Sequence, residues 1–263
     1  ILCLMDPKFM YKALFDVSAE TIKELSKDKK YLGAKIGFTS VLHTWGQNLS
    51  LHPHIHMIVP GGGIDSNGKW KSSKKKFFLP VKVVSKLFKG KFLSYIKKNF
   101  DQRKIKDKEH FQNIINTCYS KDWVVYTKKP MKSAKHVVKY LGRYTHRIAI
   151  SNARIKKYED NKVTFSYKDY SDHNKIKEMT LEDTEFFRRY MMHVLPSNFM
   201  KIRHYGFLGN RNKEERIKAV RTATNTKDPG PLLIDYEQII SDILKRDVSI
   251  CIKCGQKRHH KLE

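Results

Sequence analysis

The chain has 263 residues, 40% of them hydrophobic, which is enough to bury a core in one large domain. It carries 53 Lys and Arg against 26 Asp and Glu, a formal net charge of +27 that exceeds what solubility needs. Such a charge favours a polyanionic partner, with nucleic acid first and an anionic membrane surface second. No apolar run approaches the roughly 18 residues of a transmembrane helix, which excludes a membrane-spanning protein of that kind.

The cysteines suggest a reducing compartment and one candidate metal motif. Two of the four are close in sequence; the set is Cys3, Cys118, Cys251 and Cys254. This spacing excludes a secreted disulfide framework and favours the cytosol. Cys251 and Cys254 form half of a zinc knuckle, followed by His259 and His260, and the alternative is a tail with two free thiols.

The first half of the chain predicts helices around an antiparallel hairpin. Apolar residues at helical spacing predict a helix over residues 8–25. A strand over 33–45 and a second over 51–59 are joined by the turn-rich segment 46–50, which is typical of a hairpin. A further helix is predicted over residues 85–100.

The second half predicts shorter elements. Strands are expected, in chain order, over residues 123–127, 148–150, 156–158 and 162–167. Helices are expected over 133–144, 181–194 and 234–245. Thr180 is expected to cap the helix at 181–194, and residues 222–231 resemble a linker.

Three histidines at spacing two, His52, His54 and His56, lie on the second hairpin strand. Alternate side chains of a strand share a face, so His54 and His56 form a metal-binding edge backed by apolar residues. The hairpin would bring Gln47 and His43 near them. An open nitrogen and oxygen site suits Mg²⁺ or Mn²⁺ acting on a phosphate, with Zn²⁺ as another option and purely structural histidines as the alternative.

Two tyrosines, Tyr140 and Tyr144, are four residues apart and therefore share one face of the helix expected there. A phenol has a pKa near 10 and is a weak nucleophile unless a cation or base favours the phenolate. A divalent cation at the histidines could polarise a phosphate for tyrosine attack. The alternative is an aromatic pair packed on the core. The basic residues expected to bind DNA are Lys135, Lys139, Arg143 and Arg147.

His54-Ile55-His56 followed by Tyr140-Leu141-Gly142-Arg143-Tyr144 resembles the HUH superfamily of nucleases, named for its His–hydrophobic–His motif. More narrowly, the chain is similar to the two-tyrosine rolling-circle transposases of the IS-ninety-one type, over roughly residues 31–211. The resemblance implies an α+β fold, an HUH endonuclease core with an antiparallel sheet flanked by helices and a C-terminal helical extension. The expected divisions are an N-terminal remnant of a longer region (1–30), the nuclease domain (31–210) and a basic extension with a partial zinc knuckle (211–263).

The resemblance also implies a function: a transposase that nicks and rejoins single-stranded DNA at element ends through a metal-assisted 5′-phosphotyrosine. His54 and His56 would then bind Mg²⁺ or Mn²⁺, with Gln47 favoured as third ligand over His43 and His52. Tyr140 and Tyr144 would be the nucleophiles. Such an enzyme is expected in a prokaryotic cytoplasm, associated with the nucleoid and with no membrane partner; the sequence carries no signal for an oligomeric state.

Two other classes remain open from the sequence. One is a non-catalytic protein that binds single-stranded nucleic acid on the same basic, aromatic fold. The other is a Zn²⁺- or Mn²⁺-dependent hydrolase of a different phosphate substrate. The chain also departs from the family, whose members carry an N-terminal Cys-rich zinc module, because only Cys3 precedes residue 118.

Overall fold

The computed structural model of this protein describes residues 1–74, 78–105, 107–128, 130–131, 133–145, 149–228, 230, 235–252 and 254–257, without the side chains of residues 134, 139, 143–145 and 236. The chain forms two compact units, residues 1–225 and residues 226–263. The functional boundaries expected at residues 30 and 210 stay predictions.

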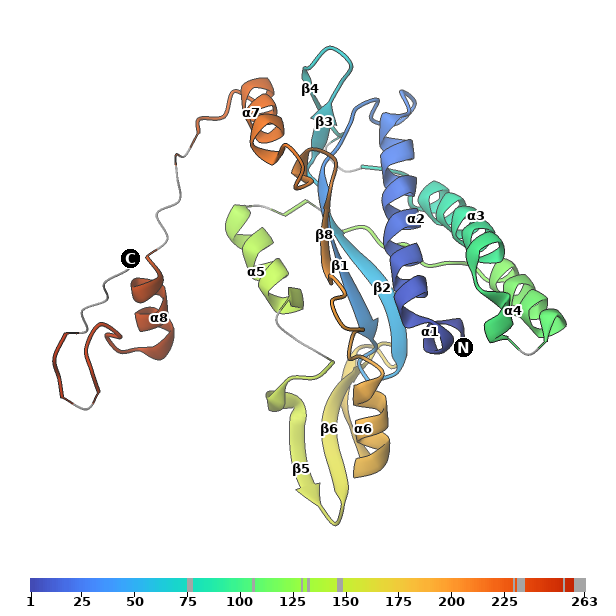
Figure 1. Ribbon diagram of the computed structural model, residues 1–263, viewed down its shortest axis with the longest axis vertical. Coiled ribbons are helices and arrows are strands. Elements are labelled where there is room, and N and C mark those ends of the chain that lie inside the picture. The colour runs from blue at the N-terminus through green and yellow to red at the C-terminus, as the bar shows by residue number, and fades with distance from the viewer. Residues whose placement is uncertain are drawn as a thin grey trace. The chain divides into compact units, whose positions relative to one another are not determined.

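A three-stranded antiparallel sheet forms the centre of the first unit (Figure 1). Its strands are β1 (Phe38–Trp45), β2 (Leu51–Ile58) and β8 (Ile202–Tyr205), in the order β2-β1-β8. The predicted hairpin is therefore present, and β1 lies between the other two strands. Because β1 is covered on both faces, nearly all of its residues are buried.

Helix α2 (Pro7–Lys27) covers one face of this sheet. It begins cleanly because Pro7 occupies its first turn and the Asp6 carboxylate accepts a hydrogen bond from the backbone N–H of Phe9 at 3.0 Å. Phe15, which is fully buried, packs against Leu42 of β1. The short helix α1 (Leu2–Met5) precedes α2.

Two further helices, α3 (Val81–Asn99) and α4 (Lys108–Ser120), extend the core beside α2. Sequence periodicity predicted the first of them and missed the second. The prediction of a strand over residues 123–127 is wrong, because these residues are not part of any sheet in the described part of the chain. They follow α4 as an irregular segment, whose side chains alternate between packed and exposed positions.

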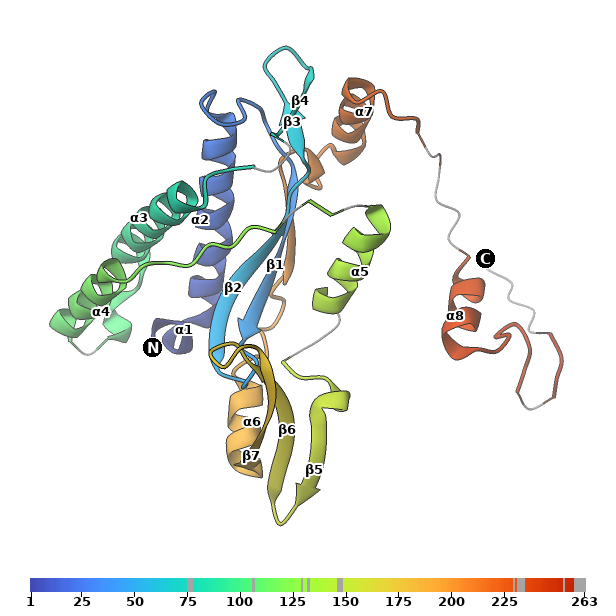
Figure 2. The same cartoon turned by 180° about the vertical axis from the view of Figure 1, so that it is seen from behind.

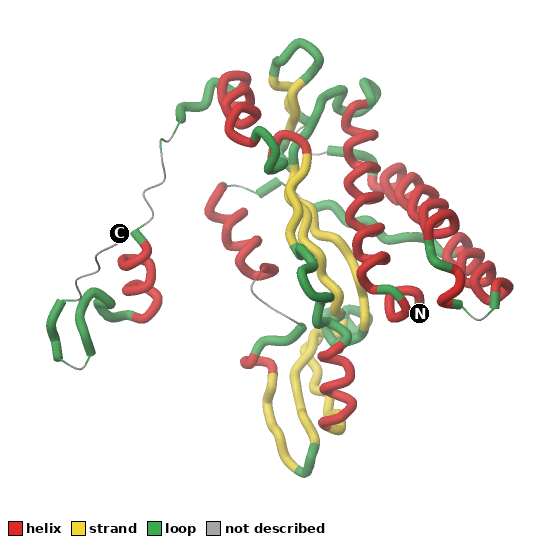
Figure 3. Tube along the Cα trace, viewed as in Figure 1, coloured by secondary structure: helices red, strands yellow, loops and turns green. Residues whose placement is uncertain are grey.

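A second three-stranded sheet has the order β5-β6-β7 (Figure 3). Its strands are β5 (Ile155–Glu159), β6 (Lys162–Asp169) and β7 (Lys175–Glu182), and helix α6 (Asp183–Met191) follows directly. The helix predicted over 181–194 is shorter than expected and Thr180 is not its cap. Thr180 lies in β7, where its hydroxyl bonds that of Thr164 at 2.8 Å, because cross-strand pairing continues through Glu182.

The remaining elements are small. They are the hairpin strands β3 (Gly62–Ile64) and β4 (Trp70–Ser72), helix α7 (Lys213–Ala223), helix α8 (Tyr236–Leu244) of the second unit, and short 3-10 turns at 102–104, 152–154 and 206–208. The strand predicted over 148–150 includes a residue outside the described ranges, and Ala149 and Ile150 form no strand. The turn after β8 requires glycine, since Gly206 has φ +60° and a Cβ there would lie 1.8 Å from the Ile36 carbonyl oxygen.

The fold is therefore a mixture of antiparallel sheets and helices, as the predicted α+β class requires. Among the described residues, none of the helices combines the length and the apolar composition needed to cross a membrane.

Candidate metal centre and nucleophile

Three histidines from the β1–β2 hairpin gather on one face of the central sheet. His43 pairs with His54 across the two strands, and Val41 pairs with His56, so all three imidazoles emerge on the same side. One ring nitrogen from each of the three lies within 4.8 Å of the others. The described part of the chain therefore contains one group of nitrogen donors that could hold a metal ion.

The distance between the two motif histidines fits a shared cation. Their Nε2 atoms are 3.0 Å apart. A metal–nitrogen bond of about 2.1 Å places two ligands at a right angle about 3.0 Å apart. The pair is thus spaced as adjacent ligands of one ion.

The backbone selects the tautomer of His54. Its Nδ1 lies 2.7 Å from the carbonyl oxygen of His52. A carbonyl can only accept, so Nδ1 carries the proton and Nε2 presents a lone pair. This is the second-shell arrangement that commonly orients a metal-binding imidazole. His52 itself contributes through its carbonyl, and its ring is exposed.

A bulge beside Pro53 positions this carbonyl. The pairing register shifts between His43 and Trp45, so β2 has one residue more than β1 in this interval. Pro53 has no N–H and would break a central ladder, but β2 is an edge strand of the sheet and tolerates it. The proline and the bulge together set the bend at which the histidine pair begins.

His43 is the most rigidly held of the three. Only 3% of its surface is exposed, and its ring stacks on Trp45 with centroids 4.7 Å apart and planes 16° apart. Its ring centroid is 4.3 Å from that of His56. Packing of this kind leaves little rotamer freedom, which favours a preorganised site.

A fourth histidine, His193, stabilises the hairpin through two hydrogen bonds. It is 2% exposed, and its Nε2 donates to the carbonyl oxygen of Leu49 at 3.1 Å. That bond leaves Nδ1 as an acceptor for the Thr44 hydroxyl at 3.3 Å. The two bonds tie β1 to the turn that leads into β2.

Helix α5 (Ala134–Thr145) lies on the other side of the sheet from α2 and brings Tyr140 to the histidines (Figure 2). The Tyr140 hydroxyl is 2.8 Å from Nδ1 of His56. The helix predicted over 133–144 is thereby confirmed, and the two motifs that are 84 residues apart in sequence meet through one hydrogen bond. Tyr140 is half-buried.

The other predicted residues are placed to different degrees. Tyr144 lies one turn after Tyr140 by its backbone, and Lys139 and Arg143 also belong to α5, but the side chains of these three are outside the described set. Arg147 is outside the described residues altogether. Lys135 is exposed on the first turn of α5.

Gln47 lies in the turn between β1 and β2. Its side-chain Nε2 is 3.5 Å from the hydroxyl of Tyr170, and its carbonyl accepts a hydrogen bond from Arg154. The role of Gln47 as a metal ligand stays a prediction. The structure places His43, the alternative, in the histidine group itself.

Burial favours the neutral form of the motif histidines. Desolvation lowers the pKa of His54 below 6.5. Desolvation, followed by the charges of His54 and Lys128, lowers the pKa of His56 to about 4. A neutral imidazole is the form that binds a metal ion.

Sequence reasoning missed two lysines near the site. Lys128 has its Nζ 5.7 Å from the ring centroid of Tyr140. Lys201, half-buried, has its Nζ 5.1 Å from the ring of Trp45, and burial lowers its pKa. Lys128 precedes α5 and Lys201 precedes β8, so only the tertiary fold brings them here, although the basic run after residue 127 was a signal for the first.

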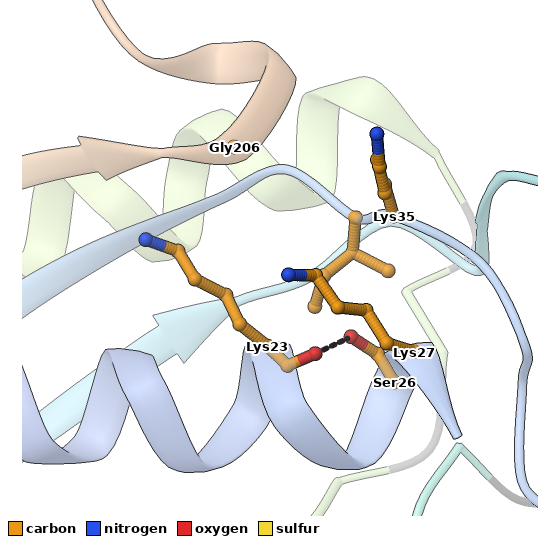
Figure 4. Close-up of a pocket in the computed structure, with 6 residues that line it drawn as sticks. Lys23, Ser26, Lys27, Lys35 and Gly206 are labelled. Carbon is orange, nitrogen blue, oxygen red and sulfur yellow. Dashed lines mark hydrogen bonds between the residues drawn. The ribbon is translucent and has the colours of Figure 1, made fainter.

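A separate basic hollow of about 190 Å³ lies beside the C-terminal end of α2 (Figure 4). Lysines from α2 and from the segment before β1 border it; the lining residues are Lys23, Ser26, Lys27, Lys35, Ile36 and Gly206. Ser26 donates to the Lys23 carbonyl at 3.0 Å. Burial and the charge of Lys27 lower the pKa of Lys23. This hollow borders α2, which covers the face opposite the histidines.

The Cys251–Cys254 segment of the second unit folds as a tight turn. Ile250 and Lys257 form an antiparallel bridge, and the Gly255 N–H donates to the Cys251 carbonyl at 2.9 Å. Gly255 has φ +69°, which glycine adopts readily. The turn brings the two cysteines to one end of a small hairpin; His259 and His260 are outside the described residues.

Comparison with known proteins assigns the chain to a family. Residues 37–216 match the family described as "Putative transposase" (Y2_Tnp), a match that contains the histidines and both tyrosines. The chain belongs to this family. The predicted resemblance to two-tyrosine transposases is thus confirmed.

Two relatives are similar over nearly the whole chain. A protein of Sinorhizobium fredii (strain NBRC 101917 / NGR234) named "Putative transposase y4qJ" is 40% identical over 261 residues, covering 94% of this chain and 66% of its own length. The "Transposase for insertion sequence element IS801" of Pseudomonas savastanoi pv. phaseolicola is 28% identical over 256 residues, covering 95% of this chain and 62% of its own length. The chain thus spans a little under two thirds of these relatives. No solved structure matches it.

The lowered histidine pKa values predict how Mn²⁺ binding depends on pH. Protons compete with the metal for Nε2, and an unperturbed pair would begin to lose Mn²⁺ near pH 6.5. Because the pKa values of His54 and His56 lie lower, we expect Mn²⁺ affinity to be constant from pH 8 to 6.5 and to fall as the pH approaches 4.

Isothermal titration calorimetry between pH 4 and 8 measures this dependence. The variant His54→Ala serves as the reference, and we expect its affinity to be lower by more than about a hundredfold, since even outer-shell changes cost 10–100-fold. A wild-type affinity that already drops with a midpoint of 6.5 or higher would contradict the prediction.

Proposed function

We propose that this chain is the catalytic part of a transposase that cleaves and rejoins single-stranded DNA through a covalent phosphotyrosine. The observation that carries the proposal is the 2.8 Å contact between the Tyr140 hydroxyl and His56, one of two histidines whose Nε2 atoms are spaced as ligands of one cation. A hydroxyl nucleophile beside a cation site is the arrangement that phosphoryl transfer requires.

In the proposed reaction the oxygen of Tyr140 attacks the phosphorus of the scissile phosphodiester. The bond from phosphorus to the 3′ oxygen breaks, and the 5′ phosphate stays on the tyrosine. The phenol loses one proton and the departing 3′ oxygen gains one, so the step is balanced. Rejoining is the reverse attack by a 3′ hydroxyl on the phosphotyrosine.

The residues of the chain hold and activate the nucleophile. His43, His54 and His56 would hold a divalent cation, which when bound stabilises negative charge on the phosphate oxygens. When the Nε2 of His56 is a ligand, its Nδ1 carries the proton and donates to the oxygen of Tyr140. A donor at that position favours the phenolate over the phenol.

The donor set favours Mn²⁺ over Mg²⁺ among the ions expected for phosphate chemistry. Imidazole nitrogens are better ligands for Mn²⁺ than for Mg²⁺, which prefers oxygen and retains its waters. Mg²⁺ at cellular concentration is the alternative ion at the same residues.

Tyr144 is proposed as the second nucleophile. It follows Tyr140 by one turn of α5, so both tyrosines belong to the same face of the helix. Two nucleophiles on one face would allow a second strand transfer while the first DNA end stays attached.

We propose that the same helix binds the DNA strand. Lys135, Lys139, Arg143 and Arg147 carry positive charge through α5 and just beyond it, and the first turn of α5 contains no acidic residue. Lysine near a helix N-terminus interacts unfavourably with the helix macrodipole and lowers helix stability. A bound anion would compensate for this cost, so the placement favours an anionic partner. The net charge of +27 supports the same partner.

The proposed mechanism predicts a covalent adduct that depends on Tyr140. Incubation of the chain with single-stranded oligonucleotides from candidate element ends and Mn²⁺ is expected to give a band of lower mobility on a denaturing gel. Tyr140→Phe lacks the attacking oxygen and is expected to lose the adduct of the first cleavage, and His54→Ala is expected to lose most of it.

The double variant Tyr140→Phe/Tyr144→Phe is the control for DNA binding, because it keeps the charges and the rings. If the wild type forms no adduct with any substrate and the double variant binds DNA equally well, the chain is a single-strand binding protein instead. Unchanged adduct formation by the double variant would exclude both tyrosines as nucleophiles.

We favour His43 over Gln47 as the third ligand, because its nitrogen lies within the histidine group. His43→Phe should keep the stacking on Trp45 and remove both nitrogens, so Mn²⁺ affinity is expected to fall at least tenfold. Gln47→Ala is expected to change it less than about twofold. Calorimetric titration measures both, with circular dichroism as the check on folding, and the opposite ranking would assign the ligand to Gln47.

We also propose a structural Zn²⁺ at Cys251 and Cys254. Two thiols on a tight turn closed by the Ile250–Lys257 bridge fit half of a tetrahedral site, and two more ligands would have to complete it. The purified chain is expected to retain zinc that Cys251→Ser/Cys254→Ser loses, as measured by atomic absorption. Equal zinc content in the two proteins would show that these cysteines hold none.

A further inference from the structure

Two residues, Trp123 and Val125, anchor the start of the segment that follows α4. Trp123 packs on Phe88 and Phe92 with ring centroids 5.5 Å away in each case, and its indole N–H donates to the Cys118 carbonyl at 2.9 Å. Val125 packs against a cluster formed by α2, α3 and the residues before α3. The backbone is therefore fixed against the core.

The residue that follows each anchor points outward. Val124 is 93% exposed and Tyr126 is 78% exposed. The usual reading of an exposed tyrosine is a solvated surface residue. Here the ring follows directly on Val125, which packs against the core, so the backbone before Tyr126 is held while its ring is presented to solvent. A fixed, exposed aromatic ring is the platform on which unpaired bases stack.

Lys128 continues this segment into the candidate site. Its Nζ is 5.7 Å from the ring centroid of Tyr140, and its charge contributes, after burial and His54, to the lowered pKa of His56. In the part of the chain that the structure describes, no carboxylate lies within ion-pair distance of Lys128. Residues 123–158 contain no Asp or Glu at all.

Lys128 is exposed, and its ammonium group adds positive charge next to Tyr140 and His56. An ammonium group near two metal-binding histidines repels a divalent cation, and the repulsion grows as water is excluded. A phosphodiester between the two cations converts the repulsion into two attractions. The alternative is an exposed, solvated lysine that rests on a tyrosine ring and contacts no DNA.

On the basis of the proposed function, we propose that Lys128 binds the scissile phosphate of the DNA strand and that Tyr126 stacks on a neighbouring unpaired base. The two residues form a substrate-positioning element outside α5. Stacking on Tyr126 requires a base with a free face, so this element selects single-stranded over double-stranded DNA. Lys128 would supply a second cation to the phosphate beside Tyr140.

Binding of a fluorescein-labelled oligo-dT strand, followed by anisotropy at several salt concentrations without metal, tests the two contacts separately. Loss of the aromatic ring on which a base stacks lowers the affinity roughly five- to a hundredfold. We expect a loss in this range for Tyr126→Ala. Tyr126→Phe should bind like the wild type, since the ring is kept. Lys128→Ala should reduce the slope of log affinity against log salt by about 0.7, the value for one lost phosphate contact on a single strand, and Lys128→Arg should restore it.

Two matched variants control for general effects. Lys27→Ala removes an exposed lysine of the helix on the opposite face of the sheet and should leave the salt slope unchanged. Tyr158→Ala removes a 64% exposed tyrosine from β5 and should leave the affinity unchanged. For duplex DNA, in which bases are already stacked, Tyr126→Ala should have no effect. If the control variants match the test variants, or if duplex binding falls as much, the proposal is overturned.

The adduct reaction separates this proposal from the proposed function. At saturating oligonucleotide and Mn²⁺, Lys128→Ala should form adduct at least tenfold more slowly. Tyr126→Ala should reach the wild-type rate once the DNA concentration is raised. If the wild type forms no adduct, the proposed function is overturned. The anisotropy results then still decide whether Tyr126 and Lys128 bind the strand. If Lys128→Ala forms adduct at the wild-type rate, Lys128 does not bind the scissile phosphate.

Discussion

The antiparallel pairing of His43 with His54 is the contact on which the candidate site depends. A strand has a side-chain period of two, so a slip of one residue would turn His54 and His56 to the other face of β2. The slip is prevented on that other face, where α2 places Phe15 against Leu42 and fills the space that the imidazoles would need. Apolar packing on one side of the sheet thereby determines polar chemistry on the other.

The two faces of the sheet are held with different strength. On one, α2 packs through several fully buried side chains, which makes the histidine-bearing strands a rigid base. On the other, the Tyr140 hydroxyl of α5 bonds His56, while Lys135, His136 and Val138 of the same helix are exposed. Elements with few buried contacts open at low cost. In the proposed reaction, Tyr140 on such a helix can adjust its position to a bound DNA strand while the histidines stay fixed.

Local sequence patterns predicted part of the fold and of the candidate site, and the rest depends on tertiary contacts. His54 and His56 share a face because of strand periodicity, and the helix that carries Tyr140 follows from its apolar spacing, so both were predictable. The preference for Gln47 over His43 came from family resemblance, whereas His43 enters the group through a register that a bulge shifts. Thr180 has the composition of a helix cap but lies in a strand, since cross-strand pairing overrides local propensity. Lys128 reaches the site through a segment that local propensity predicts as a strand but that joins no sheet among the described residues.

Pro53 has a consequence for how the protein behaves among its own copies. An edge strand with free N–H and C=O groups can pair with the edge of another molecule, and β2 is both an edge and the strand that carries the site. A residue without an N–H, placed next to a bulge, interrupts the regular row that a second strand would need. The kink that orients the histidines thus also discourages edge-to-edge self-association, so β2 can stay accessible to the proposed DNA partner even where many copies of the chain gather on one polyanion.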